Sequence, residues 1–345
     1  MLKPKPTSKT DAVGPTPRAT PRRQNRESTI SSHPPAMIAP ITPVALKPSD
    51  LADHVGEGLA SFEGIVMPTR AQLTAVRQMH SLLKMGEKQP EGQQRRAFRY
   101  LNQSGAGKST CGKILQAFVE GEPGHDPANK PVLHVTLSTT GTPKSLASSI
   151  LSAMGDNYST RGEAELLLRR VQQGIKDFQV KLLIIDELNH FRQKSLATDA
   201  ANTIKNILSL GWVPIVLMGT SDAQSLFANN RELKNRCAPQ VVLAPYGDNP
   251  DDKLQWADLL RRIDSEIVAR GILSRHSGLC QPEIAEKLRL CSNGLIGELH
   301  NILLAALETT LLAGDDFISL VSLIDAVDAW CIADGTIDRN FLRDA

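Results

Sequence analysis

A glycine-rich octapeptide has the residue types that bind phosphate groups. It reads Asn102-Gln-Ser-Gly-Ala-Gly-Lys-Ser109, and it lies between a run of strand length and a predicted helix that ends near Val119. Backbone N–H groups of such a loop and of the helix start point toward anionic oxygens. The charge of Lys108 suits the β- and γ-phosphates, and the Ser109 hydroxyl suits Mg²⁺. The motif therefore predicts a P-loop nucleotide site.

A second motif supplies carboxylates. Lys181-Leu-Leu-Ile-Ile-Asp-Glu187 is an apolar run that ends in two acids, and parallel sheets bind ligands at the carboxyl ends of such buried strands. We expect Asp186 to hold Mg²⁺ through water, together with Ser109. We expect Glu187 to orient and deprotonate the water that attacks the γ-phosphate. The residues predicted to bind ATP are Ser104, Gly105, Ala106, Gly107, Lys108, Ser109, Thr110 and Asp186.

Two further polar residues bear on this site. Asn102 occupies the place of the first P-loop glycine, which commonly needs an unusual backbone conformation, and asparagine is the best substitute for glycine there. Thr220 follows an apolar run that ends in Leu217-Met-Gly. If that strand lies between the two motif strands, Thr220 can sense the γ-phosphate or the attacking water. The other interpretation is an ordinary threonine between a strand and a turn.

The elements that must position these residues alternate between strand and helix up to Pro245. Strand patterns cover 97–101, 132–137, 180–185, 213–218 and 241–243, and helical patterns cover 70–85, the segment from the P-loop to about 119, 146–154, 164–177 and 200–210. This alternation predicts a parallel α/β sheet. Beyond Pro245 only helical patterns follow, at 254–271, 281–290, 294–313 and 320–333. They predict a separate all-α domain.

The chain is thus expected to have three parts: a tail (1–48), a nucleotide-binding domain (49–245) and a helical domain (246–345). The tail holds ten of the 21 prolines and no apolar period, so we predict that it is disordered or orders only on a partner. Its charge is +6, and because the whole chain carries +2, the remainder carries −4. A nucleic-acid role would therefore need the tail or a local patch.

Composition excludes several classes of protein. With 41% hydrophobic and 22% charged residues, the chain is typical of soluble globular proteins. No stretch approaches the roughly 20 apolar residues of a membrane span, and the basic N-terminus lacks the apolar region of a secretory signal. Five scattered cysteines without a CxxC pair argue against a disulfide frame or a zinc site. We expect a cytoplasmic protein without membrane association.

With these motifs, the chain resembles the TnsC/TniB family of transposition ATPases over about 62–326. The resemblance is carried by Pro131-Val-Leu-His-Val, Ile150-Leu-Ser-Ala-Met-Gly, Leu183-Ile-Ile-Asp-Glu-Leu-Asn-His, Met218-Gly-Thr, Lys234-Asn-Arg-Cys and, most specifically, Ser292-Asn-Gly-Leu-Ile-Gly-Glu-Leu. It implies an AAA+ fold, in which a P-loop parallel sheet is flanked by helices and joined to a smaller all-α lid domain. Many AAA+ lids carry a sensor arginine where this chain has Gly297, so we expect no such sensing from the lid.

The resemblance also implies a function. Members look like ATP-dependent, DNA-binding regulators that assemble on double-stranded DNA as rings, such as heptamers, or as helical filaments. They link a target-selection factor of the TniQ type to the transposase. For this chain the resemblance implies an Mg²⁺-dependent ATPase that DNA stimulates. ATP would act as an assembly switch, and hydrolysis would release the filament.

One arginine is expected to act on a neighbouring subunit. AAA+ sites form between subunits, and an arginine from the neighbour stabilises charge on the γ-phosphate. Arg236 is placed like the family's finger, just before the last predicted strand. Arg231 is the second choice, and either residue could instead be a surface cation on a helix.

DNA contacts are expected from two polar loops, 139–144 and 159–161. Hydroxyl groups, backbone N–H groups and one cation per loop suit phosphate contacts without base readout. The candidates are Lys144, Thr160 and Arg161. Ordinary polar turns are the alternative interpretation.

Two other classes of protein stay open. A helicase loader or replication initiator of similar AAA+ build would bind DNA with a helicase as its partner. A signalling ATPase would use the helical domain as a regulatory lid and would not need DNA to assemble. A neighbouring gene for an integrase-like transposase would favour the transposition regulator over both.

Overall fold

A computed structural model describes residues 48–138, 142–190, 194–228, 230–239 and 241–344. These residues belong to a single compact unit that begins at Leu46. The predicted tail, except for its last residue, lies outside the described residues.

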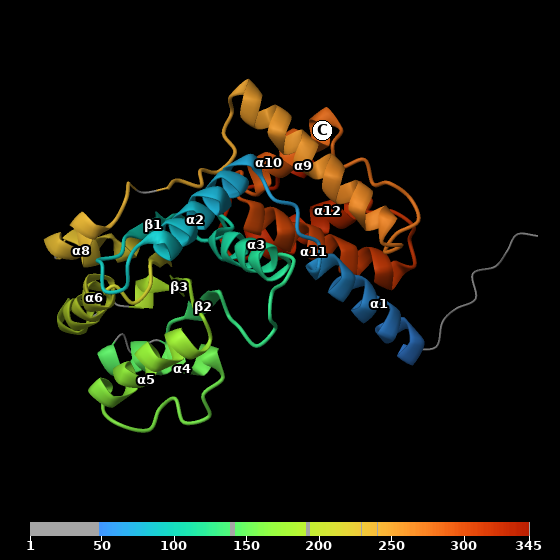
Figure 1. Ribbon diagram of the computed structural model, residues 1–345. Helices are drawn as coiled ribbons and strands as arrows, with labels where there is room; N and C mark the ends of the chain where they lie inside the picture. Colours follow the sequence, from blue (N-terminus) through green and yellow to red (C-terminus); the bar gives the residue numbers. More distant parts are fainter. Residues whose placement is uncertain (1–47, 139–141, 191–193, 229, 240, 345) are drawn as a thin grey trace, which may run out of the picture. The chain divides into compact units, whose positions relative to one another are not determined.

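A four-stranded parallel sheet forms the centre of the α/β part of the chain (Figure 1). Its strands are β1 (Ala97–Leu101), β2 (Val132–Thr136), β3 (Leu182–Asp186) and β4 (Ile215–Gly219), in the order β1-β4-β3-β2. Every residue of β3 and β4 is buried, as parallel strands covered on both faces should be. As the Thr220 interpretation requires, β4 lies between the P-loop strand β1 and the acidic strand β3.

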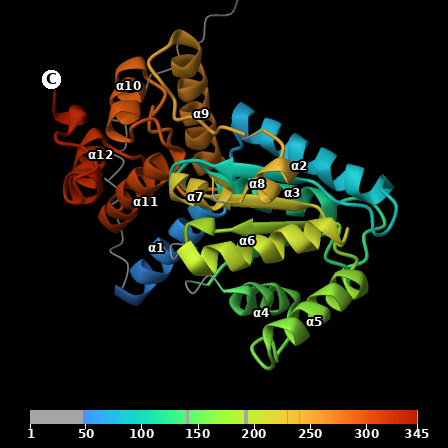
Figure 2. The same ribbon diagram turned by 90° about the vertical axis from the view of Figure 1, so that its left-hand side faces the viewer.

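Helices cover both faces of the sheet (Figure 2). On one face lie α2 (Arg70–Lys88) and α3 (Lys108–Glu120), and on the other lie α4 (Pro143–Met154), α5 (Ala164–Asp177) and α6 (Lys194–Ser209). Alternate strand residues serve the two cores, since Ile184 packs toward α2 and α3 while Ile185 packs toward α4, α5 and α6. Short helices α7 (Gln224–Ala228) and α8 (Arg231–Arg236) follow β4.

The remaining helices build the all-α lid around a second core. They are α9 (Pro250–Ala269), α10 (Pro282–Cys291), α11 (Ile296–Ala313) and α12 (Leu320–Val327), and a π-helical turn, Asp328–Ile332, continues α12. The first helix, α1 (Pro48–Glu63), also places Val55 and Phe62 in this core. The domain boundaries predicted from the sequence stay predictions.

Contrary to the expectation from the sequence, one helix among the described residues, α11, is long and apolar enough to cross a membrane by length and composition alone. Leu303 and Leu307 on this helix are fully buried in the lid core. The buried side of α11 is therefore part of the lid core.

The predicted strand at 241–243 is wrong. The backbone N–H groups of Ala238 and Val241 do donate to the carbonyl oxygens of Ala97 (2.8 Å) and Arg99 (3.1 Å) in β1. These donors are three residues apart while their acceptors are two apart, so a regular ladder cannot form. Pro239, between the donors, has no N–H to contribute.

Candidate functional site

The P-loop has a backbone that requires glycine at two positions. Gly105 and Gly107 have φ of +74° and +81°, in the left-handed region that side chains rarely adopt. A Cβ on Gly107 would lie 2.3 Å from Nε2 of Gln72, which donates to the Gly107 carbonyl oxygen over 3.2 Å. α2 thus supports the loop. Gly107 directly precedes α3, whose first-turn N–H groups have no partner within the helix and are available to phosphate oxygens.

Asn102 has a different role from the one that its position suggests. The unusual backbone conformation that its position suggests is not a left-handed one, because the only described non-glycine residues with positive φ are Gln179, Glu187 and Asn293. Instead, the buried side-chain amide holds the chain beside β1. Its Oδ1 accepts from the N–H of Leu243 (2.7 Å), and its Nδ2 donates to the carbonyl oxygen of Val241 (3.2 Å).

Lys108 is held by the loop that it serves. Its Nζ donates to the carbonyl oxygens of Asn102 (3.0 Å) and Gln103 (2.7 Å). Burial lowers the pKa of Lys108, against the opposite effect of the charges on Asp186 and Glu187. An ammonium group has three protons, so one remains for a phosphate oxygen.

The carboxylate of Asp186 accepts three hydrogen bonds. Ser109 Oγ (2.6 Å) and His134 Nε2 (3.2 Å) donate to Oδ2, and the N–H of Glu187 (2.8 Å) donates to Oδ1. Burial acts to raise the pKa of Asp186, but these donors together hold it below its ordinary value. The site thus presents an ionised carboxylate beside a hydroxyl, two oxygen ligands of the kind that Mg²⁺ prefers. The sequence did not identify His134.

Glu187 and Thr220 lie at the carboxyl ends of neighbouring strands, as predicted. Glu187 has φ of +61°, an uncommon conformation for a non-glycine residue, and it lines the same pocket as Lys108. Oγ1 of Thr220 is buried and has no hydrogen-bond partner among the described residues. A buried hydroxyl without a partner is costly, and Thr220 is not among the residues that line this pocket.

A pocket of about 490 Å³ extends from the P-loop to the lid. Its polar end is formed by P-loop residues and Glu187. Its apolar end is formed by Phe62, Ile65, Val66, Met67, Leu259 and Ile263. A polar end for phosphates and an apolar end for a planar base together fit a nucleotide. The sequence did not reveal the apolar residues, because they come from two separate segments without a motif.

The arginines considered for a role in trans lie around α8 and do not line this pocket. Arg236, at the end of α8, donates to the carbonyl oxygen of Glu232 (3.2 Å), and its Nε is buried without a partner among the described residues. Arg231 is exposed at the start of the helix. Arg99 on β1, which the sequence did not indicate as a candidate, lies over the Phe227 ring. Its Nε is also buried without a hydrogen-bond partner among the described residues.

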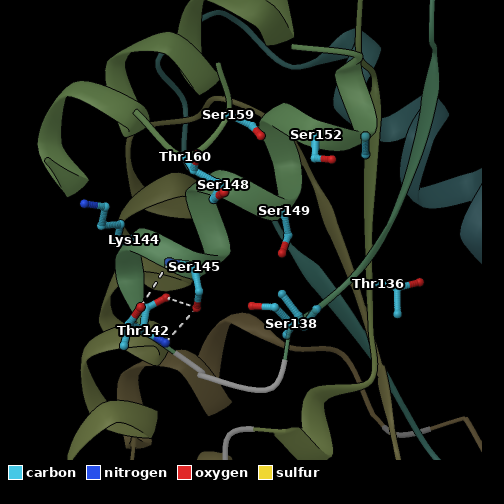
Figure 3. A pocket seen from close by; sticks show the side chains of 12 residues that line it. Thr136, Ser138, Thr142, Lys144, Ser145, Ser148, Ser149, Ser152, Ser159 and Thr160 are labelled. Atoms are coloured by element: carbon cyan, nitrogen blue, oxygen red, sulfur yellow. Dashed lines mark hydrogen bonds between the residues drawn. The ribbon is translucent and has the colours of Figure 1, made fainter. Parts of the chain in front are cut away.

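The two segments expected to contact DNA line one hollow of about 700 Å³ (Figure 3). Lys144 lies in the first turn of α4, and Thr160 lies in the loop before α5. Many of the other lining residues carry hydroxyl groups: Thr136, Ser138, Thr142, Ser145, Ser148, Ser149, Ser152 and Ser159. Residues 139–141 of the predicted loop lie outside the described residues.

Arg161 does not line this hydroxyl-rich hollow but lies next to Thr160 in the chain. Its exposed guanidinium group lies over the Tyr158 ring, 4.6 Å from the centroid. Arg170 pairs with Asp156 and donates to the carbonyl oxygens of Tyr158 (3.0 Å) and Arg161 (3.3 Å). Arg170 therefore holds the loop in shape and leaves Arg161 at the surface.

Comparisons with known proteins agree with this fold. The family model described as "Bacterial TniB protein" matches residues 65–277, more than half of the chain. No curated protein matches the sequence.

Similar solved structures share the architecture. ORC2 of Aeropyrum pernix, in ADPNP-ADP complexes, has a TM-score of 0.56 at 15% identity over 78% of this chain and 70% of that chain. Cdc6p of Pyrobaculum aerophilum has a TM-score of 0.56 at 15% identity over 77% and 69%. ORC1 of Aeropyrum pernix, in complex with DNA, has 0.52 at 14% identity over 78% and 68%. At these identities the likeness shows the AAA+ fold alone.

Proposed function

The chain belongs to the bacterial TniB family of AAA+ ATPases, and we propose that it is an ATP-dependent, DNA-binding regulator of DNA transposition. In this proposal it assembles on duplex DNA and links target selection to the transposase. The observation that carries the nucleotide part is the 2.6 Å contact between Ser109 Oγ and Asp186 Oδ2. It places the hydroxyl of the P-loop beside the carboxylate of the acidic strand, and these are two oxygen ligands of the kind that Mg²⁺ prefers.

The site residues would divide the work on ATP as follows. Backbone N–H groups of 104–110 and the remaining proton of Lys108 would bind the phosphates. Ser109 and Asp186 would hold Mg²⁺, which supplies charge neutralisation at the β- and γ-oxygens when it is bound. Glu187 would orient the attacking water and accept its proton, and the buried hydroxyl of Thr220 would donate to the γ-phosphate or contact that water.

A second copy of the chain would complete the site. Arg236 lies away from the pocket of its own chain, and its side chain is only partly buried. A γ-phosphate of the neighbouring subunit would accept hydrogen bonds from the guanidinium group and be stabilised by its positive charge. In this account ATP binding favours assembly, as a ring such as a heptamer or as a helical filament, and hydrolysis reverses it.

The hydroxyl-rich hollow supports the DNA part of the proposal. Serine and threonine hydroxyls and backbone N–H groups are common ligands of DNA phosphates and carry no sequence preference. Lys144 and Arg161 are both exposed, and neither forms an ion pair with a described residue. Their positive charges would supply the electrostatic attraction to DNA phosphates that neutral hydroxyl groups do not provide.

Nucleotide-dependent DNA binding tests the proposal. The full chain would be titrated onto a labelled duplex of arbitrary sequence, and fluorescence anisotropy would be measured with Mg²⁺-ATP, with Mg²⁺-ADP and without nucleotide. Tight binding with Mg²⁺-ATP alone, lost in Lys108→Ala, is the expected result. Equal DNA affinity in all three conditions, or none in any, would contradict it.

The protein partners need a separate test. The ATP-loaded protein on DNA would be offered an integrase-like transposase and a TniQ-type factor encoded beside its gene, with a replicative helicase as the control protein. Retention of the transposase and the TniQ-type factor, without the helicase, is expected. Retention of the helicase alone would favour a helicase loader or initiator.

A further inference from the structure

His134 lies beside the carboxylate that would hold Mg²⁺. In the register of β2 and β3, His134 is opposite Ile184, and Thr136 is opposite Asp186. Because residues two apart on a strand share a face, the side chains of His134 and Asp186 project from the same face of the sheet. Nε2 of His134 lies 3.2 Å from Oδ2 of Asp186, and the two side chains are only 14% and 4% exposed.

The helix that begins at the P-loop, α3, packs closely against the imidazole ring of His134 at Gly112. A Cβ on Gly112 would lie 3.0 Å from both Cε1 and Nδ1 of His134 and 3.3 Å from Cδ1 of Ile184. Glycine inside a helix is less favourable than alanine. At position 112, however, the methyl group of alanine would press on the imidazole ring.

The three donors to Asp186 differ in what else they would do. The Ser109 hydroxyl would also be a ligand of Mg²⁺, and the N–H of Glu187 contacts only Oδ1. His134 has no such competing task, and an ionised carboxylate can only accept from it. Outer donors of this kind orient metal-binding groups in many proteins.

We propose that His134 is a positioning residue, which holds the Asp186 carboxylate in the orientation that binds Mg²⁺ with the nucleotide. This inference rests on the proposed function, because it assumes that Asp186 serves Mg²⁺-ATP. It assigns His134 no contact with ATP itself. Removal of its hydrogen bond should therefore weaken the use of Mg²⁺ and leave metal-free nucleotide binding intact.

The test separates these two effects. Binding of a fluorescent ATP analogue to the full chain would be measured in EDTA and then during a titration with Mg²⁺. His134→Leu removes the donor at similar volume, and His134→Gln keeps an N–H near the place of Nε2. We expect equal affinities in EDTA. The Mg²⁺ midpoint should rise about 10- to 100-fold in His134→Leu and stay near the wild-type value in His134→Gln.

A further variant displaces the ring without changing the histidine, and it has a matched control. Gly112→Ala would displace the imidazole and should raise the Mg²⁺ midpoint in the same direction. Gly56→Ala, in α1, is the matched control, because a Cβ there meets nothing within 4 Å. If His134→Leu fails to fold, Gly112→Ala and His134→Gln decide the question.

Three results would overturn the inference. An unchanged Mg²⁺ midpoint in His134→Leu with normal EDTA binding would show that the hydrogen bond is not used. Equal losses in His134→Gln and His134→Leu would show that the donor is not what matters. Failure of the wild type to bind the analogue in either condition would contradict the proposed function itself, and with it the assumption on which the inference rests.

Discussion

The backbone N–H of Gly297 donates a hydrogen bond of 2.8 Å to the carbonyl oxygen of Gly105. The first residue belongs to the first turn of the lid helix α11, and the second belongs to the P-loop. A Cβ on Gly297 would lie 2.6 Å from the Cα of Gly105, so only glycine permits this approach. Many AAA+ lids have a sensor arginine at this position, whereas this lid contacts the P-loop through the backbone of Gly297.

Gly297→Ala should therefore weaken ATP binding by pushing the lid off the loop. Loss of this hydrogen bond and its packing corresponds to about 1–2 kcal/mol, or about 5- to 30-fold in Kd. Titration of a fluorescent ATP analogue measures it, with Gly56→Ala as the control. Unchanged affinity would show that the lid contact does not support the nucleotide.

Lys108→Ala and Glu187→Gln should separate binding from hydrolysis. Lys108→Ala removes a charge-assisted hydrogen bond to phosphate of about 1.5–3 kcal/mol, so affinity should fall at least about tenfold. Glu187→Gln keeps the shape of the side chain but cannot accept the proton, so it should bind ATP normally and lose turnover. Affinity and phosphate release would be measured for both. Equal loss of affinity in the two variants contradicts the role given to Glu187.

Lys144→Ala and Arg161→Ala should each reduce the dependence of DNA affinity on salt. Each phosphate contact that is lost should lower the slope of log affinity against log salt by about 0.9 on duplex DNA. Arg169→Ala is the matched control, since Arg169 is exposed on α5 and pairs with Glu165 over 2.6 Å. A slope that changes as much in the control, or in none of the three variants, would place the DNA surface elsewhere.

Arg236→Ala should abolish turnover without affecting ATP binding in its own subunit. A missing finger can cost about 10³-fold or more. Mixing it with Lys108→Ala should restore part of the activity on DNA, because an intact P-loop of one subunit then meets an intact arginine of the other. No recovery at any ratio, with co-assembly retained, would count against a trans role. Arg231→Ala and Arg99→Ala, mixed in the same way, identify the alternative.

Sequence reasoning reached the parts of the site that depend on local motifs. The P-loop and the acidic strand each have their functional residues within eight consecutive positions. Lys108, Ser109 and Asp186 could therefore be predicted as site residues from the sequence alone. The wrong interpretation of Asn102 has a non-local cause, because its amide hydrogen bonds reach Val241 and Leu243 across the chain.

His134 was missed for the same kind of reason. Its strand could be predicted, but its contact with Asp186 depends on which strands are neighbours and on their register. A run of apolar residues determines neither the neighbouring strand nor the register of the pairing. The missed apolar end of the pocket likewise needs α1, α9 and the segment 65–67 to meet, which no single stretch of sequence encodes.

The most direct test of ATP-dependent assembly on DNA is the mass of the complexes that form on a linear duplex. Glu187→Gln would be imaged by electron microscopy and weighed by mass photometry with Mg²⁺-ATP, Mg²⁺-ADP or no nucleotide, beside Lys108→Ala. We predict rings or filaments of several copies on DNA for Glu187→Gln with Mg²⁺-ATP, and none for Lys108→Ala. Monomers alone in every condition, for a Glu187→Gln protein that binds ATP, would contradict the account.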